Sequence, residues 1–337
     1  MSAAAKKVAV VLLNLGGPDG PSAVEGFLFN LFNDKAIIGL PWPFRWLLAK
    51  VISKRRAPIA REIYQNLGGG SPLLPNTQAQ AEALQDKLNR PGNGENLQAQ
   101  EFKVFIAMRY WHPFAEETVE DVQAFDPDHV VLLPLYPQYS TTTTASSLAN
   151  WKKMALRTGL KVPTWAICCY PTEEGFVSSI AELIAPRLKE AAQAGIPRLL
   201  FSAHGLPKKV IERGDPYQEQ VEQTSLAVTD LLAQEDLDYV VCYQSRVGPL
   251  EWIGPSTEEE IERAGRDGRP LVVCPIAFVS EHSETLVELD IEYGELARSS
   301  GVPLYLRVPT VDTAEPFING LACLVRDSMK TDSWVYF

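Results

Sequence analysis

The sequence predicts an α/β protein built from two parallel four-stranded sheets flanked by helices. Short apolar runs alternate with longer helical stretches, a pattern typical of parallel sheets covered on both faces. The 337 residues are enough for two domains of ordinary size, so two sheets suit the length better than one sheet of eight strands. The turn at 14–18 also resembles the turn at 203–207, as expected for two related lobes.

The elements follow in order along the chain. The expected strands cover residues 7–13, 102–107, 128–133, 163–169, 198–202, 238–243, 271–275 and 303–307, and helical stretches cover 76–88, 174–194, 216–234 and 312–328. We expect the final helix to return to the first lobe. The first lobe then comprises residues 1–160 and 308–337, and the second comprises residues 161–307.

Composition and charge exclude several classes of protein. Hydrophobic residues make up 46% and charged residues 22%, as in globular proteins. A net charge of −11 argues against general nucleic-acid binding, which needs a basic surface. The apolar run at 8–13 is too short for a signal peptide, and no stretch of about 20 apolar residues could span a membrane.

The five cysteines have no C-x-x-C spacing. All but Cys323 lie in or beside apolar strand-like runs, so we interpret them as buried thiols in a reducing compartment. This interpretation favours a cytoplasmic location.

The segment 27–56 is unusually rich in large apolar residues, and Gly39, Pro41 and Pro43 are expected to prevent one long helix. Four basic residues, Lys50, Lys54, Arg55 and Arg56, lie near its end. Two interpretations stay open. The segment is either an irregular part of the core, or an exposed apolar lip that admits a flat ligand or touches an anionic membrane.

The strongest chemical signal is a histidine at the end of a buried strand. Leu199–Phe201 leads into His204, and ligands of open α/β sheets bind beyond the carboxyl ends of the strands. A second strand, 271–275, leads into Glu281, His282 and Glu284. We therefore expect imidazole and carboxylate groups to meet at one crevice.

An acidic row follows the second strand. On an α-helix the side chains of Glu281, Glu284, Glu288, Glu292 and Glu295 would share one narrow arc. Such a row is either a solvated helix face, or a set of groups that passes protons or holds a divalent cation loosely. Like charges this close raise one another's pKa, so some of them could stay protonated near neutrality.

Further aromatic, basic and glycine-rich segments follow other strands or connect helices. They are Gly68–Pro72, Met108–Pro113, Tyr136–Ser140 and the stretch from Gln244 to Trp252. The glycine-rich segment lacks the lysine of a phosphate-binding P-loop and could simply end a helix. Together these segments indicate a site for a large, flat, acidic molecule.

The ordered motifs resemble those of the ferrochelatase family from about residue 8 to about residue 325. The matching segments are Leu13–Pro18, Gly68–Pro72, Arg109-Tyr110, Tyr136–Tyr139, Ser202–His204, Gln244–Pro249 and Pro275–Phe278 through Glu292-Tyr293. The resemblance implies two Rossmann-like lobes with a porphyrin cleft between them. It also implies insertion of Fe²⁺ into protoporphyrin IX with release of two protons. A chelatase for another metal and tetrapyrrole, and a non-enzymatic carrier of haem or iron, remain alternatives.

The resemblance also implies roles for particular residues. His204 and Glu284 are the central pair and the metal contacts, with Glu281, His282, Glu288 and Glu292 as a supporting relay. The residues implied to bind the porphyrin are Leu15, Arg55, Tyr64, Ser71, Arg109, Tyr110, Tyr136 and Trp252. Arg55, Arg109 and Ser71 are expected to hold its propionates.

Two departures among known ferrochelatases bear on this chain. Some relatives hold an iron–sulfur cluster, but here only Cys323 lies near the end and Thr141 occupies a position where some relatives have cysteine. No cluster and no tightly bound cofactor is therefore expected. Enzymes that use coproporphyrin commonly have tyrosine at the position of Leu15, so leucine favours protoporphyrin IX. The expected partners are this porphyrin, ferrous iron and, peripherally, an anionic membrane.

Overall fold

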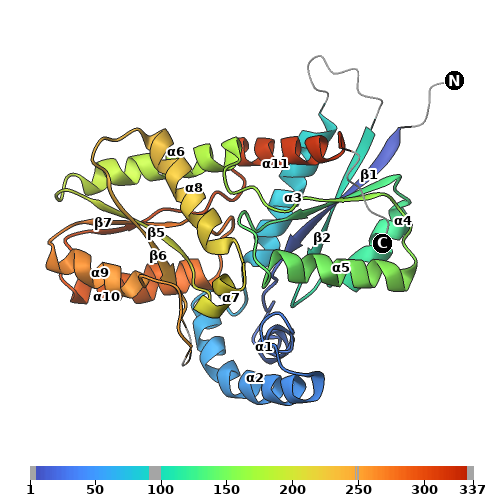
Figure 1. The fold of residues 1–337 in the computed structure, drawn as a ribbon, viewed down its shortest axis with the longest axis horizontal. Coiled ribbons are helices and arrows are strands. Elements are labelled where there is room, and N and C mark those ends of the chain that lie inside the picture. Colours follow the sequence, from blue (N-terminus) through green and yellow to red (C-terminus); the bar gives the residue numbers. More distant parts are fainter. Residues whose placement is uncertain (1–4, 91–99, 247, 249, 332–337) are drawn as a thin grey trace. The chain divides into compact units, whose positions relative to one another are not determined.

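The computed structural model describes residues 5–90, 100–246, 248 and 250–331 (Figure 1). The chain divides into two compact units. The first unit comprises residues 1–136, 141–169 and 318–337, and the second comprises residues 137–140 and 170–317. Each unit contains one four-stranded parallel sheet, so the predicted pair of sheets is confirmed.

The first sheet has the strand order β2-β1-β3-β4. Its strands are β1 (Lys6–Asn14), β2 (Gln100–Met108), β3 (His129–Pro134) and β4 (Thr164–Ala166), and its helices are α1 (Val24–Phe32), α2 (Trp42–Gln65), α3 (Leu73–Asn89), α4 (Ala115–Phe125) and α5 (Thr144–Thr158). Successive β1 side chains point to opposite faces. Val11 packs with Val119 of α4 and Trp151 of α5, whereas Asn14 donates to Thr77 of α3 at 3.0 Å. The sheet is therefore covered on both faces.

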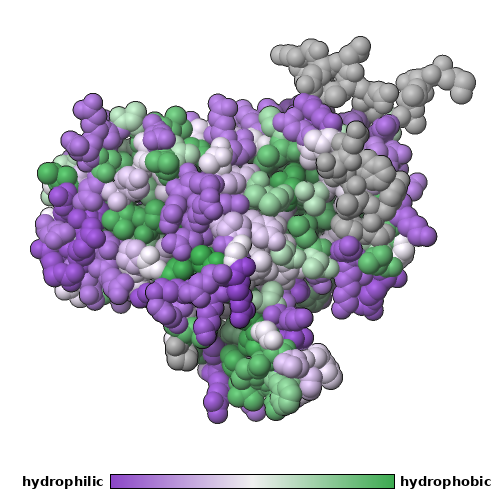
Figure 2. Space-filling model, viewed as in Figure 1, coloured by the Kyte–Doolittle hydropathy of each residue, from purple (hydrophilic) through white to green (hydrophobic). Residues whose placement is uncertain are grey.

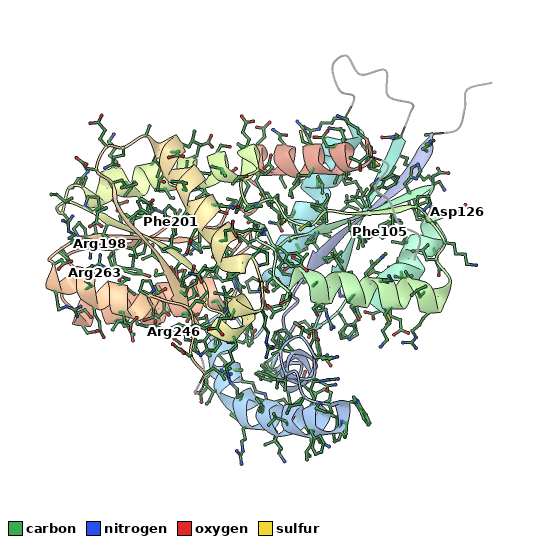
Figure 3. All side chains as sticks on the ribbon, viewed as in Figure 1. Phe105, Asp126, Arg198, Phe201, Arg246 and Arg263 are labelled. Carbon is green, nitrogen blue, oxygen red and sulfur yellow. The ribbon has the colours of Figure 1, made fainter. Side chains whose placement is uncertain are left out.

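The second sheet repeats this pattern as β6-β5-β7-β8. Its strands are β5 (Arg198–His204), β6 (Asp238–Gln244), β7 (Leu271–Pro275) and β8 (Tyr305–Arg307). Its helices are α6 (Glu174–Ala191), α7 (Lys208–Glu212), α8 (Tyr217–Leu232), α9 (Thr257–Arg266), the π-helix η1 (Glu284–Glu292) and α10 (Tyr293–Ser299). Leu200 and Val273 pack with side chains of α9, η1 and α10. Figure 3 shows Arg198 and Phe201 on β5.

The boundary between the units differs from the one predicted. The strand expected at 163–169 was assigned to the second lobe, but β4 pairs with β3 of the first sheet. Residues 308–317 were assigned to the first lobe but belong to the second unit. The remaining helix, α11 (Glu315–Ser328), begins in the second unit and continues in the first. A three-residue strand carries too little pattern to show which sheet it joins.

The segment 27–56 is partly core and partly exposed. Phe27 of α1 is buried against Tyr64 of α2, whereas Trp42 and Phe44 are each 66% exposed at the start of α2. Figure 2 shows hydrophobic residues gathered over α1 and α2. The prediction that no single helix covers the segment is confirmed, because α1 ends at Phe32 and α2 begins only at Trp42, after Gly39 and Pro41. Pro43 lies in the first turn of α2, where a missing N–H costs nothing.

Candidate active site

The central pair predicted from the sequence comes together in the second unit. His204 ends β5, Glu284 begins η1 after β7, and the two strands are neighbours in the sheet. The Nδ1 atom of His204 lies 3.0 Å from Oε2 of Glu284. Both side chains remain partly exposed, at 39% and 29%, so the pair is accessible to a substrate.

Burial and charge act against each other at this pair. Burial lowers the pKa of His204, but the carboxylates of Glu284 and Glu288 raise it by more than burial lowers it. The pKa of His204 therefore lies above the ordinary histidine value. Burial raises the pKa of Glu284, but His204 and His282 lower it to well below the usual range of a carboxyl group. The pair therefore favours an imidazolium beside a carboxylate.

His282 stands on the other side of the same carboxylate. Its Nδ1 atom lies 3.1 Å from the carbonyl oxygen of Ser280, which can only accept a hydrogen bond. Nδ1 therefore bears the proton. In the neutral ring Nε2 then keeps its lone pair, 3.9 Å from Oε2 of Glu284.

Glu288 is the most extensively hydrogen-bonded carboxylate of the site. It accepts from Gln244 Nε2 at 3.0 Å, from the Ser245 amide at 2.9 Å and from the Ser245 hydroxyl at 2.5 Å. Ser245 has a positive φ of 61°, a conformation uncommon for residues other than glycine. Burial and the nearby Glu284 raise the pKa of Glu288 despite these donors. Glu288 can therefore hold a proton more readily than an ordinary carboxyl group.

The acidic row does not follow an α-helix. Residues 284–292 form the π-helix η1, whose hydrogen bonds join each residue to the fifth one along, so the expected α-helical arc is wrong. Glu292 and Glu295 are exposed. Of the row, Glu284 and Glu288 are the members that lie at the site, and Gln244 Nε2 joins them through the carbonyl of Glu284 at 3.1 Å.

Glu281 has a different set of partners from the one expected of a relay residue. Arg307 donates to its Oε1 at 2.7 Å and the Thr310 amide donates at 3.0 Å. Burial raises the pKa of Glu281, but Arg307 and hydrogen bonds from Thr285 and Thr310 lower it below the ordinary value. This ion pair secures the segment after β7 to the end of β8.

Trp252 lies beside the predicted histidine. It forms a β-bridge with Pro207, and a Cβ added at Gly205 would lie 3.3 Å from its ring. The same added atom would lie 3.0 Å from the carbonyl of Gln244. Glycine at this position therefore lets the backbone after His204 approach both groups closely.

In the first unit, several residues implied to bind the porphyrin form an apolar cluster. Tyr64 and Tyr110 are buried in it, and Leu15 packs against its edge. Ser71 closely approaches Gly17, where an added Cβ would lie 2.5 Å from the serine Cβ. Arg55 is exposed on α2. Tyr110 is 1% exposed and belongs to the hydrophobic core, so we do not expect its side chain to contact a ligand directly.

Arg109, which is expected to hold a propionate, makes an ion pair within the first unit. It donates to Asp34 at 2.7 Å and to Ser146 at 2.8 Å, and Asp34 also accepts from the Tyr110 hydroxyl at 2.7 Å. Burial raises the pKa of Asp34, but the hydrogen bond from the Ser146 hydroxyl, the charge of Arg109 and the hydrogen bond from Tyr110 lower it below its ordinary value. Tyr136 lies near Arg109 in space, and its hydroxyl lies 3.5 Å from the hydroxyl of Ser147.

The sequence as a whole matches the family model for ferrochelatase over residues 7–329. The chain belongs to the ferrochelatase family. A ferrochelatase from Caulobacter vibrioides (strain NA1000 / CB15N) is 56% identical, with 96% of this chain and 91% of the relative covered. One from Wolbachia sp. subsp. Drosophila simulans is 54% identical, with 94% and 98% covered. The predicted activity, insertion of iron into a porphyrin to form protohaem, is confirmed by these ferrochelatase matches.

Solved structures confirm the fold of this ferrochelatase. SirB from Bacillus subtilis, solved with Fe³⁺, aligns with a TM-score of 0.57 at 11% identity, covering 96% of this chain and 95% of that one. DR2241 from Deinococcus radiodurans gives 0.51 at 12% identity and covers 99% and 58%. At such low identity the likeness shows the fold alone.

Sequence reasoning missed several polar residues of the ferrochelatase site. Gln244, Ser245 and Tyr293 contact Glu288, and Arg307 pairs with Glu281. Gln244 could have been found, because it ends a strand adjacent to β5. Ser245 and Tyr293 lie in two of the segments that resemble the family, but their contacts with Glu288 depend on the register of η1. The pairing of Arg307 with Glu281 depends on the position of β8.

Proposed function

We propose that this chain inserts Fe²⁺ into protoporphyrin IX with His204 as the proton acceptor and Glu284 as its charged partner. The observation that supports the proposal is the 3.0 Å contact between Nδ1 of His204 and Oε2 of Glu284 at neighbouring strand ends. Imidazole is the side chain best suited to exchange protons near neutral pH. A carboxylate fixed against one ring nitrogen leaves the other available to the substrate.

The porphyrin must lose two pyrrole N–H protons as the metal enters. In neutral His204 the Nδ1–H group donates a hydrogen bond to Glu284. The lone pair is then on Nε2, which can accept a pyrrole proton. The imidazolium that forms is stabilised by Glu284, and this agrees with the raised pKa of His204. Once His204 has accepted the proton, the imidazolium has no lone pair for a metal ion, so the ring that takes the proton does not hold Fe²⁺ at the same time.

Glu284 is the group best suited to meet the incoming Fe²⁺. Its lowered pKa keeps the carboxylate ionised, and oxygen ligands hold divalent iron weakly enough for release to four ring nitrogens. Within the residues that the structure describes, no group of three or more His, Cys, Asp or Glu side chains is arranged to hold a metal ion. A contact with few ligands suits iron that is a substrate in transit.

The test is turnover by two variants, His204→Ala and Glu284→Gln. Each should lower kcat by about 10²-fold or more while porphyrin affinity stays close to that of the parent. Anaerobic incubation with Fe²⁺ and protoporphyrin IX, followed through the Soret band, measures both quantities. His112→Ala is a matched control, because this histidine pairs with Glu117 at 2.9 Å on the exposed surface.

Three results of this assay would argue against the proposal. Near-normal turnover in either variant would show that His204 and Glu284 do not have the catalytic roles proposed for them. Stoichiometric binding without turnover would indicate a carrier, and faster turnover with another tetrapyrrole or metal would indicate a different chelatase.

We also propose that the enzyme works without a tightly bound cofactor or iron–sulfur cluster. Cys242 and Cys274 are buried in the second sheet, where burial raises the pKa of each thiol. Clusters need thiolates. Cys168 is exposed, contrary to the expectation that it is buried, and its Sγ lies 2.9 Å from that of Cys169. Inorganic sulfide in stoichiometric amount after anaerobic purification would contradict this proposal.

Peripheral membrane contact and a cytoplasmic location remain proposals as well. Among the described helices, none is both long and apolar enough to cross a membrane. The apolar lip, defined as residues 27–56, exposes Trp42, Phe44 and Leu47 beside Lys50 and Lys54. Apolar side chains next to basic ones suit the interface of an anionic bilayer, and the same lip could admit the porphyrin.

A further inference from the structure

Two adjacent cysteines lie where the chain passes from the first unit to the second. Cys168 and Cys169 follow β4, and the second unit resumes at Tyr170. The two Sγ atoms are 2.9 Å apart, and Cys168 is exposed whereas Cys169 is half-buried. Cys242 and Cys274 are instead buried in the second sheet. The pair therefore presents two sulfurs in contact that a small reagent in solution can reach.

The backbone on either side of the pair is fixed by hydrogen bonds. The Ile167 amide donates to the carbonyl of Leu132 on β3 at 2.9 Å, and the Tyr170 amide donates to the carbonyl of Pro137 at 2.8 Å. Tyr170 is also 3% exposed, and its ring centre lies 5.9 Å from that of Phe176. A change in the backbone between these two hydrogen bonds is therefore transmitted to residues that are already packed.

A bond between the two sulfurs would close a strained ring. Adjacent Cα atoms are about 3.8 Å apart across a trans peptide, whereas a disulfide usually joins Cα atoms about 4.4–6.8 Å apart. Strained and exposed disulfides are the ones that thiols reduce most readily. The dithiol is therefore the resting form in a reducing compartment, and the disulfide forms only when oxidant is in excess.

The chemistry of the resting pair agrees with this. Loss of solvation, the hydrogen bond with Cys169 and the charge of Cys169 raise the pKa of the Cys168 thiol to about 12. Cys168 therefore keeps its proton at neutral pH. A protonated thiol is a poor nucleophile, which protects the pair from casual oxidation.

We propose that Cys168 and Cys169 form a reversible oxidation site, which closes to a disulfide on reaction with a low-molecular-weight disulfide such as oxidised glutathione and thereby lowers turnover. One sulfur of the pair, as its thiolate, attacks the reagent, so the S–S bond of the reagent breaks and one thiol leaves. The other sulfur then loses its proton and attacks the mixed disulfide, which releases the second thiol. The two cysteines are oxidised, the reagent is reduced to two thiols, and the two cysteine protons end on those thiols.

The effect on turnover follows from contacts within the second unit. Tyr170 directly follows the ring, so closure strains its hydrogen bond to Pro137. The next residue, Gln138, donates to the carbonyl of Ile276 at 3.4 Å, and Ile276 directly follows β7. The stretch after β7 leads to Glu284. Strain at Tyr170 therefore acts on the segment that positions this carboxylate.

The experiment incubates the full-length protein with oxidised glutathione under anaerobic conditions, alkylates the remaining thiols in acid and digests with trypsin. The tryptic peptide 162–187 contains both cysteines of the pair and no other cysteine. Its mass should show the loss of two hydrogen atoms and no alkyl label. We expect kcat to fall about fivefold, the factor that corresponds to the loss of one hydrogen bond, and to recover when reduced glutathione is added.

Three variants complete the test. Cys168→Ser and Cys169→Ser should keep their turnover in oxidised glutathione, whereas Cys323→Ser, which removes an exposed cysteine elsewhere, should respond like the parent. The proposal is overturned if the peptide stays a dithiol or carries only glutathione, or if it is joined to a second chain. It is also overturned if the closed form turns over like the reduced one, or if Cys168→Ser is inhibited as strongly as the parent. The mass of the peptide does not depend on turnover, so a failure of the proposed function is recognised separately.

Discussion

The contact between His204 and Glu284 joins two groups that would each be costly to bury alone. Burial disfavours both charges, and their 3.0 Å contact more than offsets that cost, as the opposite pKa shifts show. The contact therefore has two consequences. It prepares the imidazole for proton transfer, and it makes the stability of the second unit depend on pH.

The pH dependence has a definite sign. The raised pKa of His204 means that its contribution is full below about pH 6.5, the ordinary histidine value, and is lost as the pH rises through the raised one. The lowered pKa of Glu284 means that its contribution is full above about pH 4.3 and is lost as the pH falls through the lowered one. The pair stabilises most between those values.

The measurement is the Tm of the parent and of His204→Ala across the pH range. We expect the difference to be largest near about pH 5.5 and to shrink in alkaline solution. His112→Ala controls for loss of an exposed pair. If the Tm difference between the parent and His204→Ala stays constant from acid to alkaline pH, the pair is not the source of the pH dependence of stability.

Leu15 allows a prediction about the choice of porphyrin. It packs against the apolar cluster that contains Phe27 and Tyr64, and its side chain has no hydroxyl to pair with an additional carboxylate. We expect kcat/KM to be at least about tenfold higher for protoporphyrin IX than for coproporphyrin III. Leu15→Tyr should lower the ratio of kcat/KM for protoporphyrin IX to that for coproporphyrin III. Leu67→Tyr, at the edge of the same cluster, should leave this ratio unchanged. Equal efficiency of the parent with both porphyrins would contradict this.

Single residues also show where sequence reasoning stops. His204 and Glu284 were predictable because each follows a buried strand, and strand ends of a parallel sheet meet at one edge. The role of Glu281 was not, because its partner Arg307 lies on β8, and only the pairing of β8 with β7 brings them together. The commitment of Arg109 to Asp34 depends in the same way on long-range packing.

At the scale of elements, α2 exposes both large apolar side chains and a group of basic ones. Its first turns expose large apolar side chains, and its middle carries four basic residues, Lys50, Lys54, Arg55 and Arg56. Lys50 also lies 5.0 Å from the ring centre of Trp46, which is 39% exposed. The helix therefore presents a surface suited to an interface with both lipid headgroups and acyl chains.

The triple variant Trp42→Ser, Phe44→Ser and Leu47→Ser should lose binding to anionic vesicles at low salt. Removing three exposed apolar side chains leaves only a screened electrostatic attraction, against a net charge of −11. Cosedimentation with phosphatidylserine vesicles measures this. A control variant with Ile196→Ser and Leu231→Ser removes exposed apolar groups of the second unit. Equal retention of the triple variant and the parent would disprove contact through the lip.

The π-helix η1 shows what sequence periodicity misses at this scale. The spacing of acids and leucines predicted a helix correctly, but not its register, because one added residue per turn changes every angular position. Glu284 and Glu288 nevertheless remain at the site because both contact Gln244.

The whole molecule repeats one topology twice, and this part of the fold was predictable from alternating strands and helices. The order β2-β1-β3-β4 of the first sheet returns as β6-β5-β7-β8 in the second. The alternation of strands and helices could not show to which unit β4 and residues 308–317 belong. Their membership depends on contacts distant in sequence, such as the Trp165 indole donating to the carbonyl of Thr331 at 3.0 Å.

The last helix supplies the prediction for the whole molecule. Leu321, Ala322 and Val325 of α11 are fully buried, and Arg326 donates to the carbonyl of Leu88 at the end of α3 at 3.1 Å. A chain ending at residue 317 should therefore expose the core of the first unit. We expect trypsin to cleave residues 6–169 much faster in it than in the parent, with Cys323→Ser as a neutral control on the same helix. Equal cleavage rates would show that α11 is dispensable.

The chain path also determines the order of events during synthesis. All four strands of the first sheet leave the ribosome before residue 170, yet the segment from residue 318 onward that completes this unit leaves last. Residues 170–317 emerge in one continuous stretch between these two parts. Until that segment arrives, the apolar face that it covers in the first unit stays exposed. The unit that begins first is finished last.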